Sequence, residues 1–260
     1  MKNLKARIKN GETVHGCWLA LGNAITAEIV ASAGFDWMLI DLEHGVGSEQ
    51  DALTQLQAIK HTGATGLVRV ESVHKQRILR ILDMGAEGIM CPQVSTVDDA
   101  KLMVDSMRFP PQGSRGIAKF VRGSNFGENF AEYFKTANDA LIGIAQIESP
   151  EALNHLDEIA ATDGVDVLFI GPSDLSAALG IFSQFDNPLY IDAVKAVVAA
   201  AQKAGKATGI LLPNASHYAT YYNYGVRFIA CGADSAFVAE GARAMFGRLN
   251  EANNNVNNSK

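Results

Sequence analysis

Eight short apolar runs, separated by segments of helical periodicity, constrain the fold of this 260-residue chain more than any other feature. Strands that are apolar on both faces must be covered on both faces, so their alternation with helices predicts a parallel sheet covered by helices. Eight such units predict an α/β fold in which one closed (β/α)8 TIM barrel spans residues 1–249. The runs cover residues 14–20, 36–43, 65–70, 88–93, 141–148, 165–171, 208–213 and 226–232.

The segments between the runs agree with a barrel. Several helical patterns end at a glycine, the residue that a left-handed helix cap favours, namely at Gly34, Gly63, Gly85 and Gly205. An open, doubly wound sheet is the alternative fold. Against it, no GxGxxG sequence follows the first run, and eight units close a barrel without remainder.

Composition and charge indicate a protein that acts on small molecules. The net charge is −6, and no basic stripe interleaved with aromatic residues is present, which argues against nucleic-acid binding. No apolar run approaches membrane-spanning length and the first residues lack a signal-peptide pattern, so we expect a cytoplasmic protein without a membrane partner. The Asn-rich segment 250–260 has little to bury, and we expect it to be a disordered tail.

The three cysteines are expected to be buried thiols. Cys17, Cys91 and Cys231 each lie within or beside an apolar run, which is the usual place for a free cysteine in a reducing compartment. Their odd number and the absence of a CxxC pair argue against a disulfide framework or a zinc cluster.

Polar and ionisable residues are concentrated where the apolar runs end. In a (β/α)8 barrel these strand ends form the catalytic face. Such groups are costly to bury unpaired, so their common placement implies that they satisfy one another or a ligand. The residues concerned are Asp41, Glu43, His44, Arg69, Gln146, Glu148 and Asp174.

Two of these carboxylates, from neighbouring strands, could share one cation. Gln146 and Glu148 are two residues apart and therefore point to the same side of their strand, and Asp174 follows the next strand in "GPSD". A donor set of oxygen atoms without His or Cys suits Mg²⁺ or Mn²⁺. Alone, each carboxylate would more often be a salt-bridge partner or a helix cap, but their joint placement favours a metal site.

Arg69 and His44 are the other candidates for chemistry. The guanidinium of Arg69 could hold a carboxylate or polarise a carbonyl, or it could pair with a carboxylate of the rim, and spacing alone leaves both roles open. His44 follows a strand end directly and has Asp41 nearby, which predicts an acid/base dyad that is active near neutral pH.

The long connection over residues 108–139 is predicted to be a lid, a binding loop or a subunit contact. Its basic residues Arg115, Lys119 and Arg122 would suit an anionic ligand, or they could be ordinary surface charges. An aldolase that forms an imine needs a lysine on a strand facing into the barrel, and only Lys119 is not excluded. A phosphate-binding barrel is weakly supported, because "LLPNAS" after the seventh run has no glycine.

The motifs "DLEHG", "VRV", "QIES" and "FIGPSDLSAALG", in this order, resemble the HpcH/HpaI aldolase family of metal-dependent pyruvate aldolases. The likeness covers nearly the whole chain except the Asn-rich segment. It implies a TIM barrel of the phosphoenolpyruvate/pyruvate-binding type and reversible cleavage of a 4-hydroxy-2-oxo acid to pyruvate and an aldehyde, through a pyruvate enolate stabilised by the metal.

Carried over residue by residue, the resemblance implies that Glu148 and Asp174 bind Mg²⁺ or Mn²⁺, with Co²⁺ also suited. Gln146 would lie in the pyruvate pocket, Arg69 would contact the keto acid, and His44 would be the acid/base residue. By the same resemblance, the main chain around Pro172 and Ser173 would receive the pyruvate carboxylate.

The resemblance also implies a hexamer (a trimer of dimers) with exchanged C-terminal helices. In that assembly Arg122 would reach the site of a neighbouring subunit.

One departure from the family pattern leaves the acceptor open. Many pyruvate aldolases read "GEHAPN" where this chain reads "LEHGVG", which retains His44 but alters the aldehyde side of the pocket. The variant is similar to other members of the superfamily, so an oxaloacetate decarboxylase or a related decarboxylating carbon–carbon lyase or synthase is the alternative. A keto-acid sensor without activity is disfavoured, because an acid/base pair would be surplus to binding.

Overall fold

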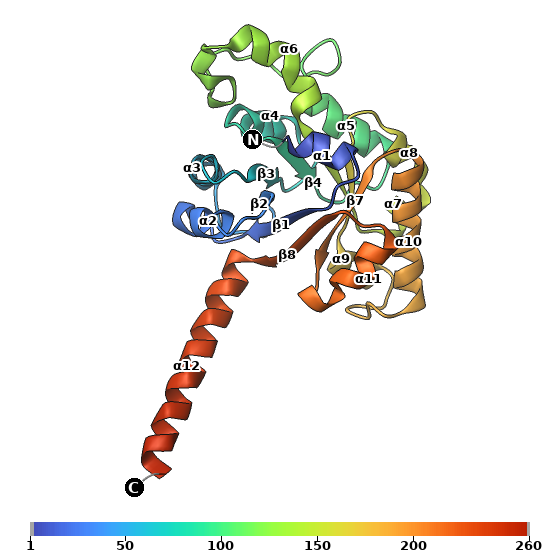
Figure 1. Cartoon of the computed structure of the whole chain (residues 1–260). Coiled ribbons are helices and arrows are strands. Elements are labelled where there is room, and N and C mark those ends of the chain that lie inside the picture. Colours follow the sequence, from blue (N-terminus) through green and yellow to red (C-terminus); the bar gives the residue numbers. More distant parts are fainter. Residues whose placement is uncertain (1–2, 259–260) are drawn as a thin grey trace.

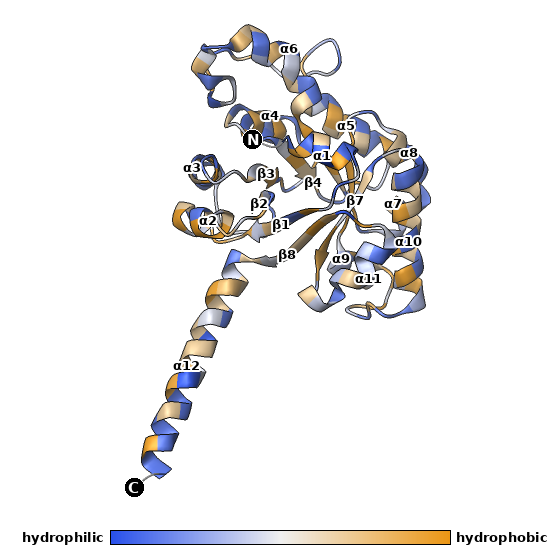
Figure 2. Cartoon of the chain, in the orientation of Figure 1, coloured by the Kyte–Doolittle hydropathy of each residue, from blue (hydrophilic) through white to orange (hydrophobic). Residues whose placement is uncertain are grey.

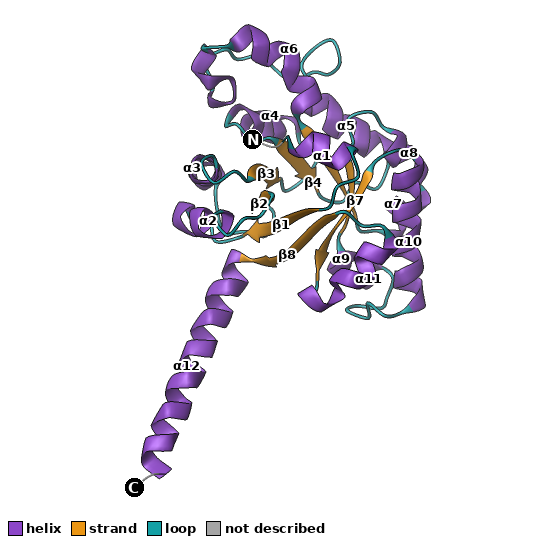
Figure 3. Cartoon of the chain, viewed as in Figure 1, coloured by secondary structure: helices purple, strands orange, loops and turns teal. Residues whose placement is uncertain are grey.

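The computed structural model describes residues 3–258 and has the predicted closed barrel of eight parallel strands, paired in chain order from β1 to β8. Figure 3 shows the strands surrounded by helices. Each strand lies within or beside one of the apolar runs. The strands are β1 Val14–Leu19, β2 Trp37–Asp41, β3 Thr65–Arg69, β4 Gly88–Cys91, β5 Ile142–Ile147, β6 Val167–Ile170, β7 Ala207–Leu212 and β8 Phe228–Ala233.

Helices follow the strands around the outside of the barrel, and short 3-10 turns precede two of them (Figure 1). The helices are α1 Leu4–Lys9, α2 Ala24–Ala31, α3 Glu49–Ile59, α4 Lys75–Asp83, α5 Val97–Met107, α6 Phe130–Ala140, α7 Pro150–Asn154, α8 Leu156–Ala161, α9 Pro172–Ala178, α10 Pro188–Lys203, α11 Tyr218–Tyr224 and α12 Asp234–Asn258. The 3-10 turns are η1 Arg122–Gly127 and η2 Ala215–His217. The glycines predicted to end helical segments all have positive φ, from 68° at Gly205 to 105° at Gly34.

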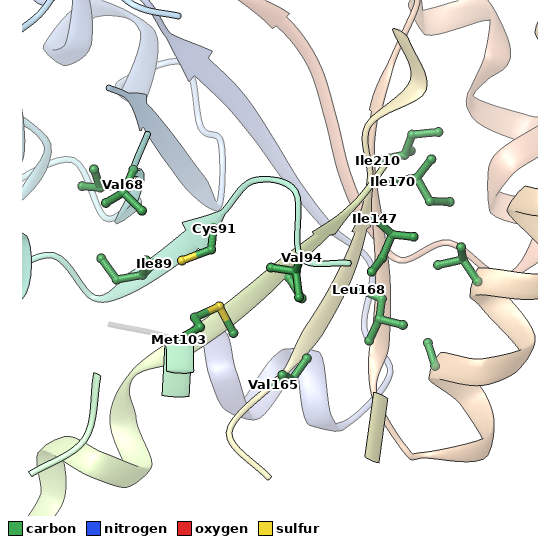
Figure 4. Packing of buried hydrophobic residues seen from close by; sticks show 14 of the residues in the cluster. Val68, Ile89, Cys91, Val94, Met103, Ile147, Val165, Leu168, Ile170 and Ile210 are labelled. Atoms are coloured by element: carbon green, nitrogen blue, oxygen red, sulfur yellow. The ribbon is translucent and has the colours of Figure 1, made fainter. Parts of the chain in front are cut away.

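The apolar core has two layers, one on each face of the barrel wall. The outer layer lies between the strands and the helices, and Figure 4 shows part of it, including Ile89, Ile147, Leu168 and Met103 of α5. The inner layer fills the barrel itself, with Trp37 stacked on Phe228 at 4.1 Å between ring centroids. Because both faces are apolar, the sequence shows continuous runs in place of an alternating pattern.

The N-terminal end of the barrel is closed by α1. Leu4 and Ile8 pack into the inner layer, and the buried Lys5 donates to the carbonyl of Leu141 and forms an ion pair with Asp166 at 3.0 Å. Asp166 is also buried and accepts a hydrogen bond from the main-chain N–H of Gly143 at 3.0 Å. This end of the barrel is therefore plugged, and the C-terminal end is where strand-end side chains can meet a ligand.

The long connection over residues 108–139 contains η1 and ends in α6. Arg115 is almost fully buried in an ion pair with Asp83 at 2.8 Å, with its guanidinium 4.4 Å from the ring of Phe109. Arg115 therefore stabilises the connection and is not available to an anionic ligand. Lys119 is exposed and contacts the ring of Phe120.

The helix α12 projects away from the barrel (Figure 1). The predicted tail over residues 250–260 falls partly in this helix, because the structure continues α12 through Asn258, and residues 259–260 lie outside the described part. Once a helix has been nucleated, each added residue gains a hydrogen bond, so even a polar segment can extend it. Of the helices in residues 3–258, none combines the length and the apolar character needed to cross a membrane.

Candidate active site

Four buried polar side chains continue the inward-facing rows of the barrel at its C-terminal end. Strand side chains alternate between the two faces, so the positions two residues beyond the apolar interior residues also face inward. β2 and β3 pair in a register that sets the Cα of Asp41 opposite that of Arg69. None of the four is more than 7% exposed, so they must satisfy one another or a ligand. They are Asp41, Arg69, Gln146 and Glu148.

Arg69 connects the carboxylates of the neighbouring strand. Its Nε and Nη2 donate to the two carboxylate oxygens of Asp41, at 3.0 and 2.7 Å. Its Nη1 lies 2.9 Å from Oε2 of Glu43 and 3.5 Å from Oε1 of Gln146. The structure therefore shows one of the two predicted roles, pairing with a carboxylate of the rim, and leaves Nη1 as its least tightly held donor.

Glu148 is the buried carboxylate at the end of β5. It accepts hydrogen bonds from the main-chain N–H of Gln93 at 2.8 Å and from Nε2 of Gln146 at 2.5 Å. Burial raises the pKa of Glu148 to about 7, and the negative charges of Asp174 and Glu43 add to that rise, while the two hydrogen bonds oppose it. Such a carboxylate is costly to keep charged without a cation.

Gly171 allows β6 to approach Glu148 closely. A Cβ atom at this position would lie 2.5 Å from Oε2 of Glu148 and 2.9 Å from Nε2 of Gln146. Any larger residue would therefore displace the two side chains that the sequence places at the end of β5.

His44 lies on the loop after β2 and is mostly exposed, with 70% of its side chain accessible. The predicted hydrogen bond between Asp41 and its imidazole is not formed, because Asp41 binds Arg69 and accepts from the main-chain N–H groups of Glu43 and His44, at 3.0 and 3.3 Å. The carboxylate that faces the imidazole is that of Glu43, 3.9 Å from Nε2. Asp41 therefore shapes the loop that carries His44 and does not orient the ring directly.

Asp174 lies near enough to Glu148 for its charge to raise the pKa of that carboxylate. It lies in the first turn of α9, which begins at Pro172 and has no side-chain cap. Ser173 and Asp174 are exposed at the rim, and the charge of Asp174 raises the pKa of both Glu148 and Glu43.

Arg122, by contrast, lies outside the rim of its own chain. Its Nη1 donates to the carbonyl of Met84 at 2.6 Å and its Nη2 to the carbonyl of Leu56 at 3.3 Å, between the ends of α4 and α3. Burial lowers the pKa of Arg122, and Glu87 opposes that shift. Within one chain, Arg122 therefore stabilises the ends of α4 and α3.

The sequence profile of one known family, described as HpcH/HpaI aldolase/citrate lyase, matches residues 15–240, which include every residue of the site above. The chain belongs to this family. A 4-hydroxy-2-oxo-heptane-1,7-dioate aldolase of Salmonella arizonae is 39% identical over 250 residues, with 96% of this chain and 95% of that protein covered. The aldolase of the same name from Salmonella typhimurium gives the same values.

Solved structures agree with the family assignment. A HpcH/HpaI aldolase/citrate lyase family protein from Burkholderia cenocepacia superposes with a TM-score of 0.91 at 36% identity, covering 96% of this chain and all of that one. The citrate synthase SbnG superposes with a TM-score of 0.87 at 26% identity, covering 97% and 99% of the two chains. Like its HpcH/HpaI relatives that are named as aldolases, the chain is a carbon–carbon lyase.

Sequence reasoning gave no role to three residues that shape this HpcH/HpaI site. Glu43 is a polar residue at a strand end in "IDLEHG", and Gln93 ends the fourth run in the same way. Burial raises the pKa of Glu43, while the positive charge of Arg69 acts to lower it. The Oε2 atom of Glu43 has an ion pair with Arg69 but no hydrogen bond in the described residues. Gly171 carries no chemical signal in the sequence, because its importance depends on a tertiary contact.

The donor set of the site fits a hard divalent cation. Within residues 3–258, no group of three or more His, Cys, Asp and Glu side chains is arranged to hold a metal. Glu148 and Asp174 supply two carboxylates, and the raised pKa of Glu148 indicates uncompensated negative charge there. Mg²⁺ and Mn²⁺ accept oxygen ligands and commonly keep positions for substrate and water, so a pair of carboxylates suits them.

Proposed function

We propose that this HpcH/HpaI protein is a divalent-metal-dependent pyruvate aldolase, which reversibly cleaves a 4-hydroxy-2-oxo acid to pyruvate and an aldehyde. The main support is the buried Glu148, whose pKa is raised to about 7 beside Asp174 and within reach of the Arg69 network. Relatives named 4-hydroxy-2-oxo-heptane-1,7-dioate aldolase, at 38–39% identity over nearly the full chain, support the substrate class.

In this proposal, Glu148 and Asp174 hold Mg²⁺ or Mn²⁺, with Co²⁺ as a further suitable ion. Bound there, the cation would supply Lewis-acid chemistry at the 2-oxo group of the substrate. Gln146 holds Glu148 in place through its Nε2 and is itself buried, so it fixes the direction of the carboxylate.

Arg69 acts on the keto acid through Nη1. Asp41 engages Nε and Nη2 in short hydrogen bonds, whereas Nη1 has a long hydrogen bond to Gln146 at 3.5 Å and an ion pair with Glu43 at 2.9 Å that is not aligned as a hydrogen bond. Nη1 is therefore the donor that a substrate oxygen can most readily take over, by displacing Gln146. Negative charge grows on the 2-oxo oxygen during cleavage, and a preorganised cation stabilises it more in the transition state than in the ground state.

His44 is the acid/base residue. Its exposed imidazole can take the proton of the 4-hydroxyl group in cleavage and return it in the reverse reaction. The carboxylate of Glu43, 3.9 Å from Nε2, stabilises the imidazolium electrostatically. Glu43 thus takes the supporting role that the sequence predicted for Asp41.

The substrate carboxylate is received at the start of α9. Pro172 has no N–H group, so the donor must be the main-chain N–H of Ser173 or its successor, and the absence of a side-chain cap leaves this turn open to a ligand.

Pyruvate release from a panel of 4-hydroxy-2-oxo acids tests the proposal. We expect activity that EDTA abolishes and Mn²⁺ or Mg²⁺ restores, and we expect His44→Ala to lose about 10²- to 10⁴-fold in kcat. His155→Ala, which changes an exposed histidine paired with Glu158 on the outer helices, is the matched control and should be fully active. Metal-independent cleavage by the EDTA-treated protein would refute the proposal.

An oxaloacetate decarboxylase, or a related decarboxylating lyase or synthase, is the second candidate. The similarity to the solved citrate synthase favours it, as does the "LEHGVG" sequence on the side of the pocket that faces the acceptor. Pyruvate formation from oxaloacetate, measured beside the aldol panel, distinguishes the two. A kcat/KM for oxaloacetate above that for every 4-hydroxy-2-oxo acid would make decarboxylation the main activity.

A further inference from the structure

Asp234 is a buried carboxylate that lies outside the site described above. It is the first residue of α12, directly after β8, and only 1% of it is exposed. Oδ1 accepts from the main-chain N–H groups of Ala20 and Ser235, both at 2.8 Å. Oδ2 accepts from the N–H of Leu21 at 3.3 Å and from the hydroxyl of Thr26 at 3.1 Å.

Two of these four donors, Ala20 and Leu21, belong to the connection between β1 and α2, and a third, Thr26, lies in the first turn of α2. No ion pair in the part of the chain that the structure describes includes Asp234, so hydrogen bonds alone compensate the buried charge. Removing the carboxylate would leave the partly buried N–H groups of Ala20 and Leu21 without this acceptor, which is costly. The loop after β1 therefore depends on Asp234 for its position.

The loop after β1 in turn supports the loop that carries Glu43 and His44. The carbonyl of Ala20 accepts the N–H of Val46 at 3.0 Å. Gly22, at φ +61°, packs directly on Gly47, where a Cβ added to Gly22 would lie 2.7 Å from the Cα of Gly47. Hydrogen bonds and backbone packing thus connect Asp234 to Val46 and Gly47, which follow His44 in the same loop.

We propose that Asp234 is a positioning residue of the active site, which fixes the loop of His44 and Glu43 through the loop after β1. The catalytic part of this inference rests on the proposed function, since it concerns turnover by His44. Because Asp234 also begins α12, the same side chain connects the active site to the projecting helix (Figure 1).

Amide exchange and kinetics of Asp234→Asn and Asp234→Ala, in the full chain, test the proposal. The asparagine keeps one acceptor for Ala20 but presents an amide to Leu21, so its effect should be intermediate. In the alanine variant we expect faster hydrogen exchange at Ala20, Leu21 and Val46. We also expect kcat to fall about 10- to 100-fold with little change in KM for the keto acid, because a catalytic group displaced by about 1 Å loses rate on this scale.

Asp166→Asn is the matched control, because it changes a buried carboxylate that accepts a main-chain N–H at the opposite end of the same barrel. It should lower the melting temperature and speed exchange at Gly143, yet leave kcat and the exchange of Val46 unchanged. An equal loss of kcat in Asp166→Asn would overturn the proposal, since general destabilisation would then explain both variants.

Hydrogen exchange also distinguishes an error in the positioning role of Asp234 from an error in the proposed aldolase function. If the wild-type protein shows no aldolase activity, the proposed function fails, while wild-type exchange at Val46 in Asp234→Ala would refute the positioning role by itself. Should the Asp234 variants not fold, Thr26→Val removes one donor to the same carboxylate. It should raise exchange at Leu21 and Val46 by a smaller factor, and unchanged exchange at both would count against the role.

Discussion

At the residue scale, the site depends on the buried guanidinium of Arg69, which holds two carboxylates. Arg69 binds Asp41 through two parallel hydrogen bonds and Glu43 through an ion pair, and all three come from β3 and the end of β2. This arrangement pairs the buried Arg69 with the buried Asp41 and the partly buried Glu43, and it leaves the carboxylate of Glu148 as the group that still needs a cation.

Replacing Arg69 by Lys should preserve the charge but remove the planar fork. A lysine cannot bridge both oxygens of Asp41 while directing a second nitrogen to the substrate, so we expect kcat to fall by about 10²-fold or more. Steady-state pyruvate release measures the loss. Arg115→Lys, at a buried arginine paired with Asp83 away from the site, should lower thermal stability and leave kcat unchanged. Full activity in Arg69→Lys would show that only the charge matters.

The raised pKa of Glu148 makes the stability of the metal-free protein depend on pH. The ordinary pKa of 4.5 rises to about 7 on folding, so the folded chain binds this proton more tightly than the unfolded chain. The resulting stabilisation is complete below about pH 4.5 and is lost as the pH rises through about 7. Thermal unfolding of EDTA-treated protein should therefore show a larger fall in Tm between pH 5.5 and 8 for the wild type than for Glu148→Gln. Equal falls would contradict the assignment.

Binding of a divalent cation to Glu148 should depend on pH in the opposite direction, becoming stronger as the pH rises. Mn²⁺ competes with the proton on Glu148, so its apparent affinity should rise as the pH approaches about 7 and level off above it. Calorimetric titration across this range measures the affinity, and Glu148→Gln should show neither strong binding nor the same dependence. An affinity independent of pH between 5.5 and 8 would mean that Glu148 is not a ligand.

At the element scale, the loop after β2 has its shape fixed by close backbone contacts. A Cβ atom at Gly45 would lie 2.1 Å from the carbonyl oxygen of Asp41 and 3.2 Å from that of Ala20. Neither atom can rotate away, because both belong to the main chain. The glycine that distinguishes "LEHGVG" from the usual family pattern is therefore required by this particular loop conformation.

Gly45→Ala should thus move the loop and displace His44. We expect kcat to fall about 10- to 100-fold, with metal affinity retained because Glu148 and Asp174 lie on other elements. Gly241→Ala is the matched control, since a Cβ there meets nothing within 4 Å and an alanine inside a helix gains roughly 0.5 to 1 kcal/mol. Pyruvate release and manganese titration test both variants, and a fully active Gly45→Ala would show that the loop tolerates the change.

The sequence predicted the elements and the inward-facing residues well, for a physical reason. Apolar runs that alternate with helices leave little choice of fold, and the period of two along a strand determines which strand-end residues enter the barrel. Asp41, Arg69, Gln146 and Glu148 were found in this way and lie together. In the structure Asp41 contacts Arg69 and the main chain of the loop, while Glu43 faces the imidazole of His44, because a loop can turn its side chains in directions that spacing does not specify.

Other features depend on tertiary contacts that leave no local pattern. The burial of Arg115 follows from its packing against Phe109 and Asp83, although its sequence context resembles an exposed basic loop. The close approach of Gly171 to Glu148 has the same origin. Such roles can be recognised only when the two partners are seen in space.

At the scale of the whole molecule, α12 presents apolar side chains that no other segment of residues 3–258 covers. Figure 2 shows hydrophobic and hydrophilic residues distributed along this projecting helix. Of its 25 residues only Asp234 is buried, while Met245, Phe246 and Leu249 are 52%, 65% and 60% exposed. A helix without tertiary packing is marginal in water, so this one needs a partner surface.

We expect that partner to be another copy of the chain, in the hexamer with exchanged C-terminal helices that the family resemblance implies. Light scattering after size-exclusion chromatography should give about six times the chain mass of 27.8 kDa for the wild type. The double variant Phe246→Glu and Leu249→Glu should give a smaller species, because charges on the apolar face cannot be buried without a partner. Asn253→Glu places the same charge at an exposed polar position of α12 and should leave the hexamer intact. A monomeric wild type, or an undisturbed hexamer in the double variant, would show that α12 does not hold the subunits together.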